Sequence, residues 1–162
     1  MKLLVTGGTF DKEYDEISGR LFFKETHVAE MLRLGRSAVA IDVETLMMID
    51  SLEITDRDRA AIVASCQTSN DHQIVVTHGT DTMEHTARAL GEAKISGKTI
   101  VLTGAMVPYK FGSSDGLFNL GSAIAFAQTL PNGVYVAMNG RWFSWKTVRK
   151  NKITGEFYEE KK

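Results

Sequence analysis

Five short apolar runs, rich in Val and Ile, constrain the fold of this chain more than any other feature. They span Lys2 to Thr6, Ala38 to Val43, Gln73 to Thr77, Thr99 to Thr103 and Val134 to Met138. Continuous apolar runs of this length, without polar alternation, are typical of strands that are buried on both faces of a parallel sheet. The sequence therefore predicts a sheet covered by helices on both sides.

Segments with helical spacing lie between these runs. Four helices are predicted: one around Val28 to Leu34, one from near Thr55, one from Asp81 with a capping box completed by Glu84 and an end at Gly91 or Gly97, and one after Ser114 and Asp115. Strands that alternate with helices are joined by right-handed crossovers. The expected fold class is α/β, a doubly wound, mostly parallel sheet of the Rossmann or flavodoxin-like type in three layers.

Composition narrows the class of protein. With 162 residues, 43% of them hydrophobic, the chain suffices for one packed domain, expected over residues 1–162. The formal net charge of −1 offers no general attraction to nucleic acid or to anionic membranes. We therefore expect a small-molecule partner and no binding to nucleic acid or to membranes.

Cysteine usage and hydropathy bear on the compartment. Cys66 is the sole cysteine and is expected to be a core thiol, and no Cys/His cluster has the spacing of zinc ligands, so no metal is expected. No apolar run has the length of a signal-peptide core or a membrane span. We therefore expect a soluble, cytoplasmic protein.

Three of the predicted strands end in small and hydroxyl-bearing residues. The first run continues into Thr6 to Thr9, the third into Thr77 to Asp81 and the fourth into Thr103 to Met106. Because ligands bind beyond the carboxyl ends of parallel strands, these residues are the first candidates for chemistry.

The turn at Gly7 and Gly8 allows positive φ angles and lets a ligand approach main-chain amides, with Thr9 pointing toward it. An ordinary tight turn is the simpler interpretation. A phosphate-binding loop, and with it a nucleotide-binding function, is a further alternative, although the full GxGxxG and P-loop patterns are absent. The following stretch, Phe10 to Phe23, is either a lid over this edge or a solvated β-hairpin.

The other strand ends also have structural alternatives. Asp81 is either a helix N-cap or a ligand contact, and His78 is a hydrogen-bonded structural histidine more often than a catalytic base. Met106 is expected to fill a gap in the core. Ser114 and Asp115 are most simply helix caps.

A basic run extends from Trp145 to Lys152, and a solvated face is its usual explanation.

Taken together, Thr6 to Thr9, Thr77 to Met83, and Thr103 to Met106 with the segment Ser114 to Asn119 resemble the signature blocks of the bacterial-type L-asparaginase family. The stretch Val136 to Lys150 resembles the family segment that leads to its catalytic lysine. The resemblance implies an amidohydrolase that releases ammonia from the side-chain amide of L-asparagine through a threonine nucleophile, with L-glutamine as a second candidate substrate. It implies no metal and no organic cofactor.

The resemblance also implies roles for single residues. Thr9 matches the nucleophile, Thr80 the second threonine and Lys150 the lysine of the family's catalytic group. Asp81 matches the aspartate that contacts the substrate ammonium. Tyr14, in the following loop, is taken as the lid tyrosine that hydrogen-bonds to the nucleophile.

Ser51 resembles the serine that binds the substrate α-carboxylate, and backbone groups at Gly8 and Gly79 are expected to contact the substrate. Leu52 departs from the family's usual glutamine. The longer enzymes continue into a smaller C-terminal domain, so the resemblance implies a short, single-domain form, with a homodimer or other homo-oligomer expected. The alternative is a non-catalytic module of the same fold that binds an amino acid or amide.

Overall fold

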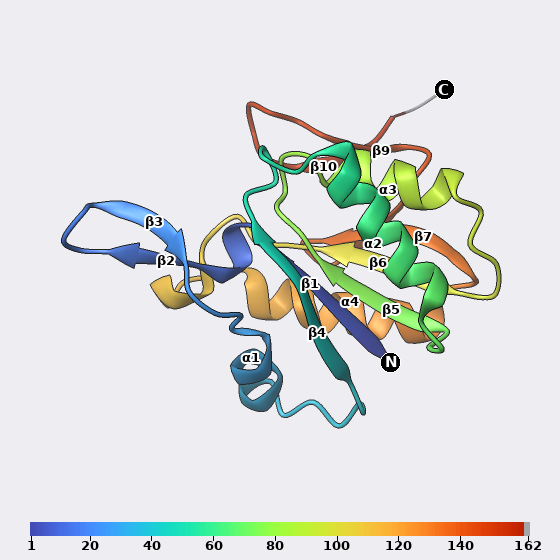
Figure 1. Ribbon diagram of the computed structural model, residues 1–162, viewed down its shortest axis with the longest axis horizontal. Helices are drawn as coiled ribbons and strands as arrows, with labels where there is room; N and C mark the ends of the chain where they lie inside the picture. Colours follow the sequence, from blue (N-terminus) through green and yellow to red (C-terminus); the bar gives the residue numbers. More distant parts are fainter. Residues whose placement is uncertain (161–162) are drawn as a thin grey trace.

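A computed structural model, which describes residues 1–160, contains a central sheet of six strands in the order β4-β1-β5-β6-β7-β8 (Figure 1). The parallel strands are β1 (Lys2–Gly7), β4 (Asp42–Ile49), β5 (Gln73–Thr77), β6 (Thr99–Thr103) and β7 (Gly133–Met138). An antiparallel strand, β8 (Arg141–Ser144), pairs with β7 at one edge. The predicted mostly parallel sheet is confirmed.

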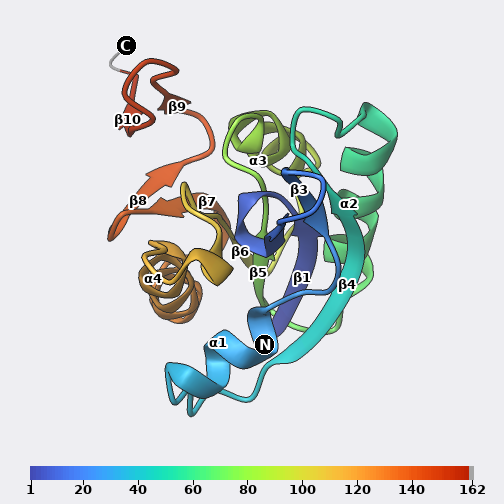
Figure 2. The same cartoon turned by 90° about the vertical axis from the view of Figure 1, so that its left-hand side faces the viewer.

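Helices cover both faces of this sheet. On one face lie α1 (Val28–Leu34) and α4 (Gly116–Thr129), and on the other lie α2 (Asp56–Thr68) and α3 (Met83–Glu92) (Figure 2). Successive strand side chains point to opposite faces, so Leu4 joins the core under α2 and α3 while Leu3 and Val5 join the core under α1 and α4. The doubly wound, three-layer α/β fold is therefore confirmed.

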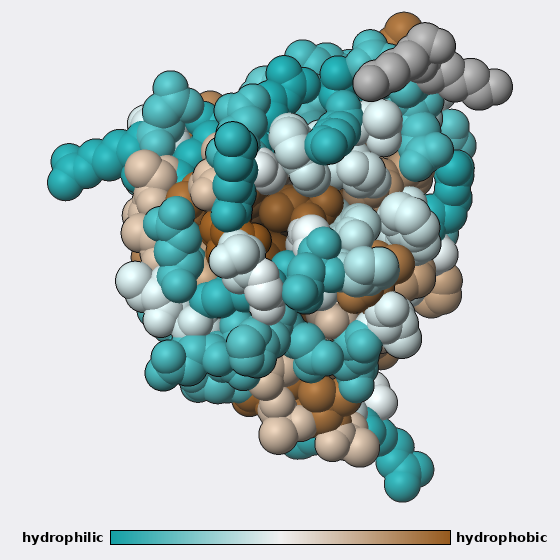
Figure 3. Space-filling view, turned by 90° about the vertical axis from the view of Figure 1, so that its right-hand side faces the viewer, coloured by the Kyte–Doolittle hydropathy of each residue, from teal (hydrophilic) through white to brown (hydrophobic). Residues whose placement is uncertain are grey.

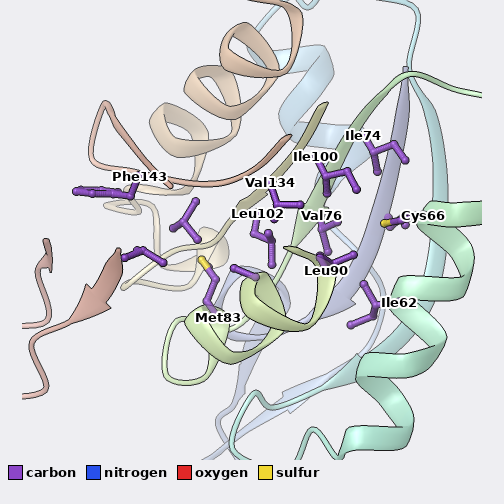
Figure 4. Packing of buried hydrophobic residues seen from close by; sticks show 14 of the residues in the cluster. Ile62, Cys66, Ile74, Val76, Met83, Leu90, Ile100, Leu102, Val134 and Phe143 are labelled. Carbon is purple, nitrogen blue, oxygen red and sulfur yellow. The ribbon is translucent and has the colours of Figure 1, made fainter. Parts of the chain in front are cut away.

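Buried aliphatic side chains fill the layer between the sheet and α2 and α3. Figure 4 shows Ile62 and Cys66 of α2 and Met83 and Leu90 of α3 facing the strands. Cys66 is fully buried, as predicted, and burial raises the pKa of its thiol to about 12. This cysteine is a packing residue.

One crossover departs from the expected handedness. The connections through α3 and α4 advance across the sheet in the same direction, yet the two helices lie on opposite faces. The β6–α4–β7 crossover therefore has the opposite hand to the β5–α3–β6 crossover, and the expectation that every crossover is right-handed is wrong. The reason is the long segment 104–115, which carries the chain past the end of the sheet before α4 begins.

Two predicted boundaries also need correction. The strand expected over Ala38 to Val43 begins at Asp42, which pairs with Lys2, and runs to Ile49. The capping box expected at Asp81 and Glu84 is absent: α3 begins at Met83 after Thr82, which makes no side-chain cap. Gly91 lies inside this helix, which ends at Glu92.

The helix predicted from near Thr55 is confirmed, and the structure shows a capping box at its start. Thr55 accepts a hydrogen bond from the backbone N–H of Asp58, and the Asp58 carboxylate accepts one in return from the backbone N–H of Thr55. This reciprocal arrangement satisfies two amides at the start of α2.

Two hairpin-like units lie outside the central sheet. The first is β2 (Lys12–Asp15) with β3 (Arg20–Phe23), and it projects from the body of the molecule (Figure 1). The second is β9 (Val148–Lys150) with β10 (Phe157–Glu159). Val148 and Phe157 belong to the core beside α3, so this second unit is anchored by burial rather than by strand pairing with the sheet.

No helix among residues 1–160 is long and apolar enough to cross a membrane.

The packing of Trp145 on α3 gives a stability test with a matched control. A Cβ on Gly91 would overlap the Trp145 ring, whereas a Cβ on Gly121 in α4 would meet no atom within 4 Å. We expect Gly91→Ala to lower the free energy of unfolding by roughly 1–3 kcal/mol through overpacking, in spite of alanine's better helix propensity. Gly121→Ala should raise it by up to about 1 kcal/mol.

Urea denaturation of both variants measures these changes. An increase in stability for Gly91→Ala would show that Trp145 does not pack on α3 as described.

Candidate active site

The strand order puts a topological switch point between β1 and β5, which predicts a crevice at the ends of these two strands. The chain leaves β1 for β4 on one side and then returns to place β5 on the other side of β1. Connections that diverge in this way leave a gap above the carboxyl ends of the two neighbouring strands, where doubly wound proteins bind ligands. Gly8 and Thr9 follow β1 and Gly79 and Thr80 follow β5, so both predicted threonines belong to this switch point.

Close backbone packing joins the two loops. Gly8 has a φ of 78°, and a Cβ on it would overlap the backbone of Gly79. A Cβ on Gly79 would in turn come within 2.6 Å of the Ser51 hydroxyl oxygen, in the loop after β4. Three strand ends therefore meet only because two of them carry glycine.

This contact also bears on the phosphate-binding alternative. Gly8 donates its N–H to the carbonyl of Ile49 at 3.0 Å, and its open side is occupied by Gly79. Glycine is needed in this turn because the backbone of Gly79 packs against it. The glycine-rich turn was the only feature that favoured nucleotide binding, so this alternative loses its support.

Lys150 connects the end of β5 to the β9–β10 unit. Its Nζ lies 2.8 Å from the Thr80 Oγ1 and 2.6 Å from the Asp81 Oδ1. The lysine side chain is only 7% exposed, while that of Asp81 is 51% exposed. The expectation that the basic run forms a solvated face is wrong for Lys150, because this cation is buried against a carboxylate and a hydroxyl.

Asp81 and Thr80 thus hold the lysine ammonium just beyond the carboxyl end of β5. Asp81 does not cap α3, so its carboxylate serves the lysine instead, and its exposed part leaves room for a ligand contact. Thr80 is 5% exposed.

Met106 covers the hydroxyl of Thr80. The Thr80 Oγ1 donates to the Met106 sulfur at 3.6 Å, and the methionine side chain is 44% exposed. Its terminal methyl also lies beside Gly155, in the turn between β9 and β10. The prediction that Met106 fills a core gap is wrong; the segment 104–115 passes over the end of the sheet and places this side chain on the edge of the crevice.

A buried brace holds that segment in place. Asn119 donates to the carbonyl of Gly104 and to Asp115, and its amide oxygen accepts the N–H of Asn139, all at 2.9 Å. Asp115 accepts hydrogen bonds from the backbone N–H groups of Met106 and Val107 and makes no side-chain cap. Ser114 does cap, since its Oγ accepts the N–H of Gly116.

His78 lies beneath the crevice and is fully buried. Its Nδ1 is 2.7 Å from the carbonyl of Gly79 and its Nε2 is 2.8 Å from the Thr86 Oγ1. A carbonyl only accepts, so Nδ1 carries the proton and Nε2 accepts from the threonine hydroxyl. Burial lowers the pKa of His78 to about 4, which keeps the ring neutral and confirms the structural interpretation.

The hairpin carrying Tyr14 stands apart from this cluster. Tyr14 is 57% exposed, and among residues 1–160 no hydrogen bond joins it to Thr9. The hairpin is tethered at its base by Lys12, which pairs with Asp50, and by the buried Asp11, which accepts from Thr26 and from the His27 N–H. The hairpin shape is confirmed, and the solvated interpretation describes this conformation.

The amino-terminal ends of the parallel strands lie on the side of the sheet opposite to Thr9 and Thr80. Figure 3 shows the molecule from that side, with hydrophilic side chains surrounding a central hydrophobic area. A hollow of about 330 Å³ at the start of β1 and β4 is lined by polar groups, and its lysine, Lys2, is paired with Asp42 and Glu44. Lys2 is held by two carboxylates, whereas Lys150 is held by one carboxylate and one hydroxyl.

Residues 1–160 contain no group of three or more His, Cys, Asp or Glu side chains placed to hold a metal ion.

Comparison with known proteins agrees with this geometry. The sequence profile described as "Asparaginase, N-terminal" matches residues 1–156. The chain belongs to the asparaginase family.

Individual family members show how far the similarity extends. The L-asparaginase of Thermococcus kodakarensis is 33% identical over 143 residues, which cover 85% of this chain and 44% of that protein. A protein of Haemophilus influenzae named as a probable periplasmic L-asparaginase is 36% identical over 94% of this chain and 46% of its own length. The solved structure of the thermostable Thermococcus kodakarensis enzyme superposes with a TM-score of 0.80 at 28% identity, covering 98% of this chain and 51% of that one.

The chain spans about half the length of these asparaginases.

The sequence did not predict that two residues, Glu84 and Met106, belong to the site. Glu84, assigned to a capping box, instead accepts the backbone N–H of Lys150 at 3.1 Å. Met106, assigned to the core, lies on the crevice. In both cases the partner is distant in the sequence, so no local pattern signals the contact.

The neutral state of His78 predicts a pH dependence of stability. The folded-state pKa of about 4 lies below the unfolded value, so on acidification the unfolded chain takes up a proton first and stability falls. The expected loss from this residue is about 2 kcal/mol between about pH 7 and pH 5.

Urea denaturation across this pH range measures the loss, and His78→Asn should remove it from the difference between the two pH values. The exposed His72→Asn variant is the control and should behave as the parent does. A His78 ring that titrates near its ordinary pKa in an NMR experiment would contradict the assignment.

Proposed function

We propose that this site hydrolyses the side-chain amide of L-asparagine to L-aspartate and ammonia, with Thr9 as the nucleophile. The observation that carries the proposal is the contact of the Lys150 ammonium with Thr80 and Asp81, on a strand end that packs directly against the loop of Thr9. Family membership supports the same reaction.

The first step forms an ester and releases ammonia. The Thr9 Oγ attacks the amide carbon and loses its proton, which passes to the leaving nitrogen as the C–N bond breaks. A hydroxyl is a weak nucleophile at neutral pH, so this step requires a group that takes the proton during attack.

Two groups can take that proton. Thr80, in the loop after β5, is hydrogen-bonded to the Lys150 Nζ and can pass the proton to that nitrogen when the lysine is a neutral amine. Tyr14 reaches Thr9 only if the β2–β3 hairpin folds toward the crevice, a closure that would also exclude bulk water from the site. Its role as lid tyrosine stays a prediction.

The developing oxyanion needs donors that are aimed at it in advance. His78 binds the Gly79 carbonyl, and because the peptide bond is planar and trans, the N–H of Thr80 points the opposite way. That N–H, at the end of β5, is a suitable donor.

The substrate's α-amino and α-carboxyl groups would be bound by neighbouring side chains. The exposed half of the Asp81 carboxylate suits the ammonium, and Ser51, beside Gly79, suits the carboxylate. In the second step water attacks the ester carbon and restores the Thr9 hydroxyl. L-Glutamine is a second possible substrate of the same site.

Several expectations remain predictions: one domain over residues 1–162, a homodimer or other homo-oligomer, and a cytoplasmic location.

Removal of the proposed groups tests the reaction. Thr9→Ala, Thr80→Ala and Lys150→Met should each lower ammonia release from L-asparagine by roughly a hundredfold or more, because each removes the nucleophile or part of its proton-transfer network. A coupled ammonia assay, repeated with L-glutamine, measures the rates.

Lys146→Met, four residues before Lys150 and exposed, is the matched control and should retain the parent rate. Full turnover by Thr9→Ala would contradict the assignment of the nucleophile. Saturable binding of L-asparagine by the unaltered chain without ammonia release would favour the alternative of a non-catalytic binding module.

A further inference from the structure

Lys150 is not held by the central sheet. It is the last residue of the three-residue strand β9, which pairs with β10 in a separate two-stranded unit. Short strands in a two-stranded unit are not stable by themselves, so the position of this lysine depends on contacts with the rest of the molecule.

Glu84 provides one such contact through the backbone. Its Oε2 accepts the N–H of Lys150 at 3.1 Å, across 66 positions of sequence. Glu84 lies in the first turn of α3, and its side chain is 20% exposed, so a carboxylate is held where the β9 backbone approaches the helix.

Residues 80–84 therefore bind both the side chain and the backbone of Lys150. Thr80 and Asp81 bind its Nζ, and Glu84, three residues after Asp81, binds its backbone N–H. Fixing the backbone defines where the flexible lysine stem starts, which limits the positions that its ammonium can reach.

Another role for Glu84 would be purely structural. An acidic residue in the first turn of a helix favours the helix dipole, and the Glu84 Oε1 lies 3.6 Å from the Nε2 of His85. His85 is 57% exposed on its side chain, so that pairing is weak in water. The two roles differ in what they require: the dipole needs a charge, whereas the backbone contact needs only an acceptor oxygen.

We propose that Glu84 is a positioning residue for Lys150, holding the β9 backbone so that the ammonium stays between Thr80 and Asp81. The inference rests on the proposed function for its effect on catalysis, while its effect on the lysine itself is independent of turnover.

The test compares Glu84→Gln, which keeps an acceptor oxygen, with Glu84→Ala and Glu84→Leu, which lack one. The first readout is the rate at which an amine-reactive acetylating reagent modifies Lys150, measured by peptide mass spectrometry against Lys146 in the same digest. The second is kcat and KM for ammonia release from L-asparagine. Glu92→Ala, at the exposed end of the same helix, is the matched control.

We expect Glu84→Ala and Glu84→Leu to lower kcat by roughly tenfold or more, with a KM within about twofold of the parent value, because a displaced group costs rate more than ground-state binding. Acetylation of Lys150 should become several times faster relative to Lys146, because the side chain leaves its buried position. Glu84→Gln should keep both readouts within about threefold of the parent values, since a neutral acceptor forms a weaker bond in the same place.

Unchanged acetylation of Lys150 in Glu84→Ala and Glu84→Leu would overturn the proposal, as would a Glu84→Gln variant that is as defective as Glu84→Ala. If the parent chain releases no ammonia, the proposed function fails, and the acetylation rates still decide the role of Glu84.

Discussion

The close approach of Gly8 to Gly79 is the contact on which the site depends. The two residues lie in the loops that follow neighbouring parallel strands, and any side chain on Gly8 would force these loops apart. Because each glycine is followed directly by a threonine, the backbone contact sets the separation of the two hydroxyl-bearing residues. Ser51 fits against the same contact from a third strand, so one tight packing point organises residues from β1, β4 and β5.

A second level of organisation brings a cation to this point. This cation, Lys150, does not lie on the central sheet. It lies on the β9–β10 unit, which is anchored by Val148, Phe157 and the packing of the Trp145 ring on α3. Buried charge is costly unless it is paired, and Lys150 meets a carboxylate and a hydroxyl on arrival. The apolar anchor and the polar contacts thus act together, one fixing the unit and the other orienting its single buried ammonium.

The sequence predicted much of this arrangement, for identifiable reasons. Buried parallel strands have a strong local signal, so the strands at Lys2, Gln73 and Thr99 are predicted correctly, as is the helix from near Thr55. The grouping of Thr80, Asp81 and Lys150 came from resemblance to a family, because spacing alone says nothing about a contact across seventy positions.

The predictions that were wrong concern residues and helices whose positions depend on tertiary contacts. Glu84 has the spacing of a capping residue but meets a backbone N–H that arrives from β9, and Met106 has the character of a core residue but lies on a segment that crosses the end of the sheet. The reversed hand of the β6–α4–β7 crossover has the same origin, since no local pattern reports which face a helix will cover. Local rules predicted the elements, and long-range packing determined the site.

The nucleophile can be identified by trapping the residue that becomes acylated. The protein is mixed with L-asparagine, quenched in acid during turnover, digested and analysed by mass spectrometry for a peptide carrying the mass of asparagine less ammonia. We expect this adduct to lie on Thr9 and to disappear in Thr9→Ala. An adduct on Thr80, or ammonia release that persists in Thr9→Ala, would contradict it.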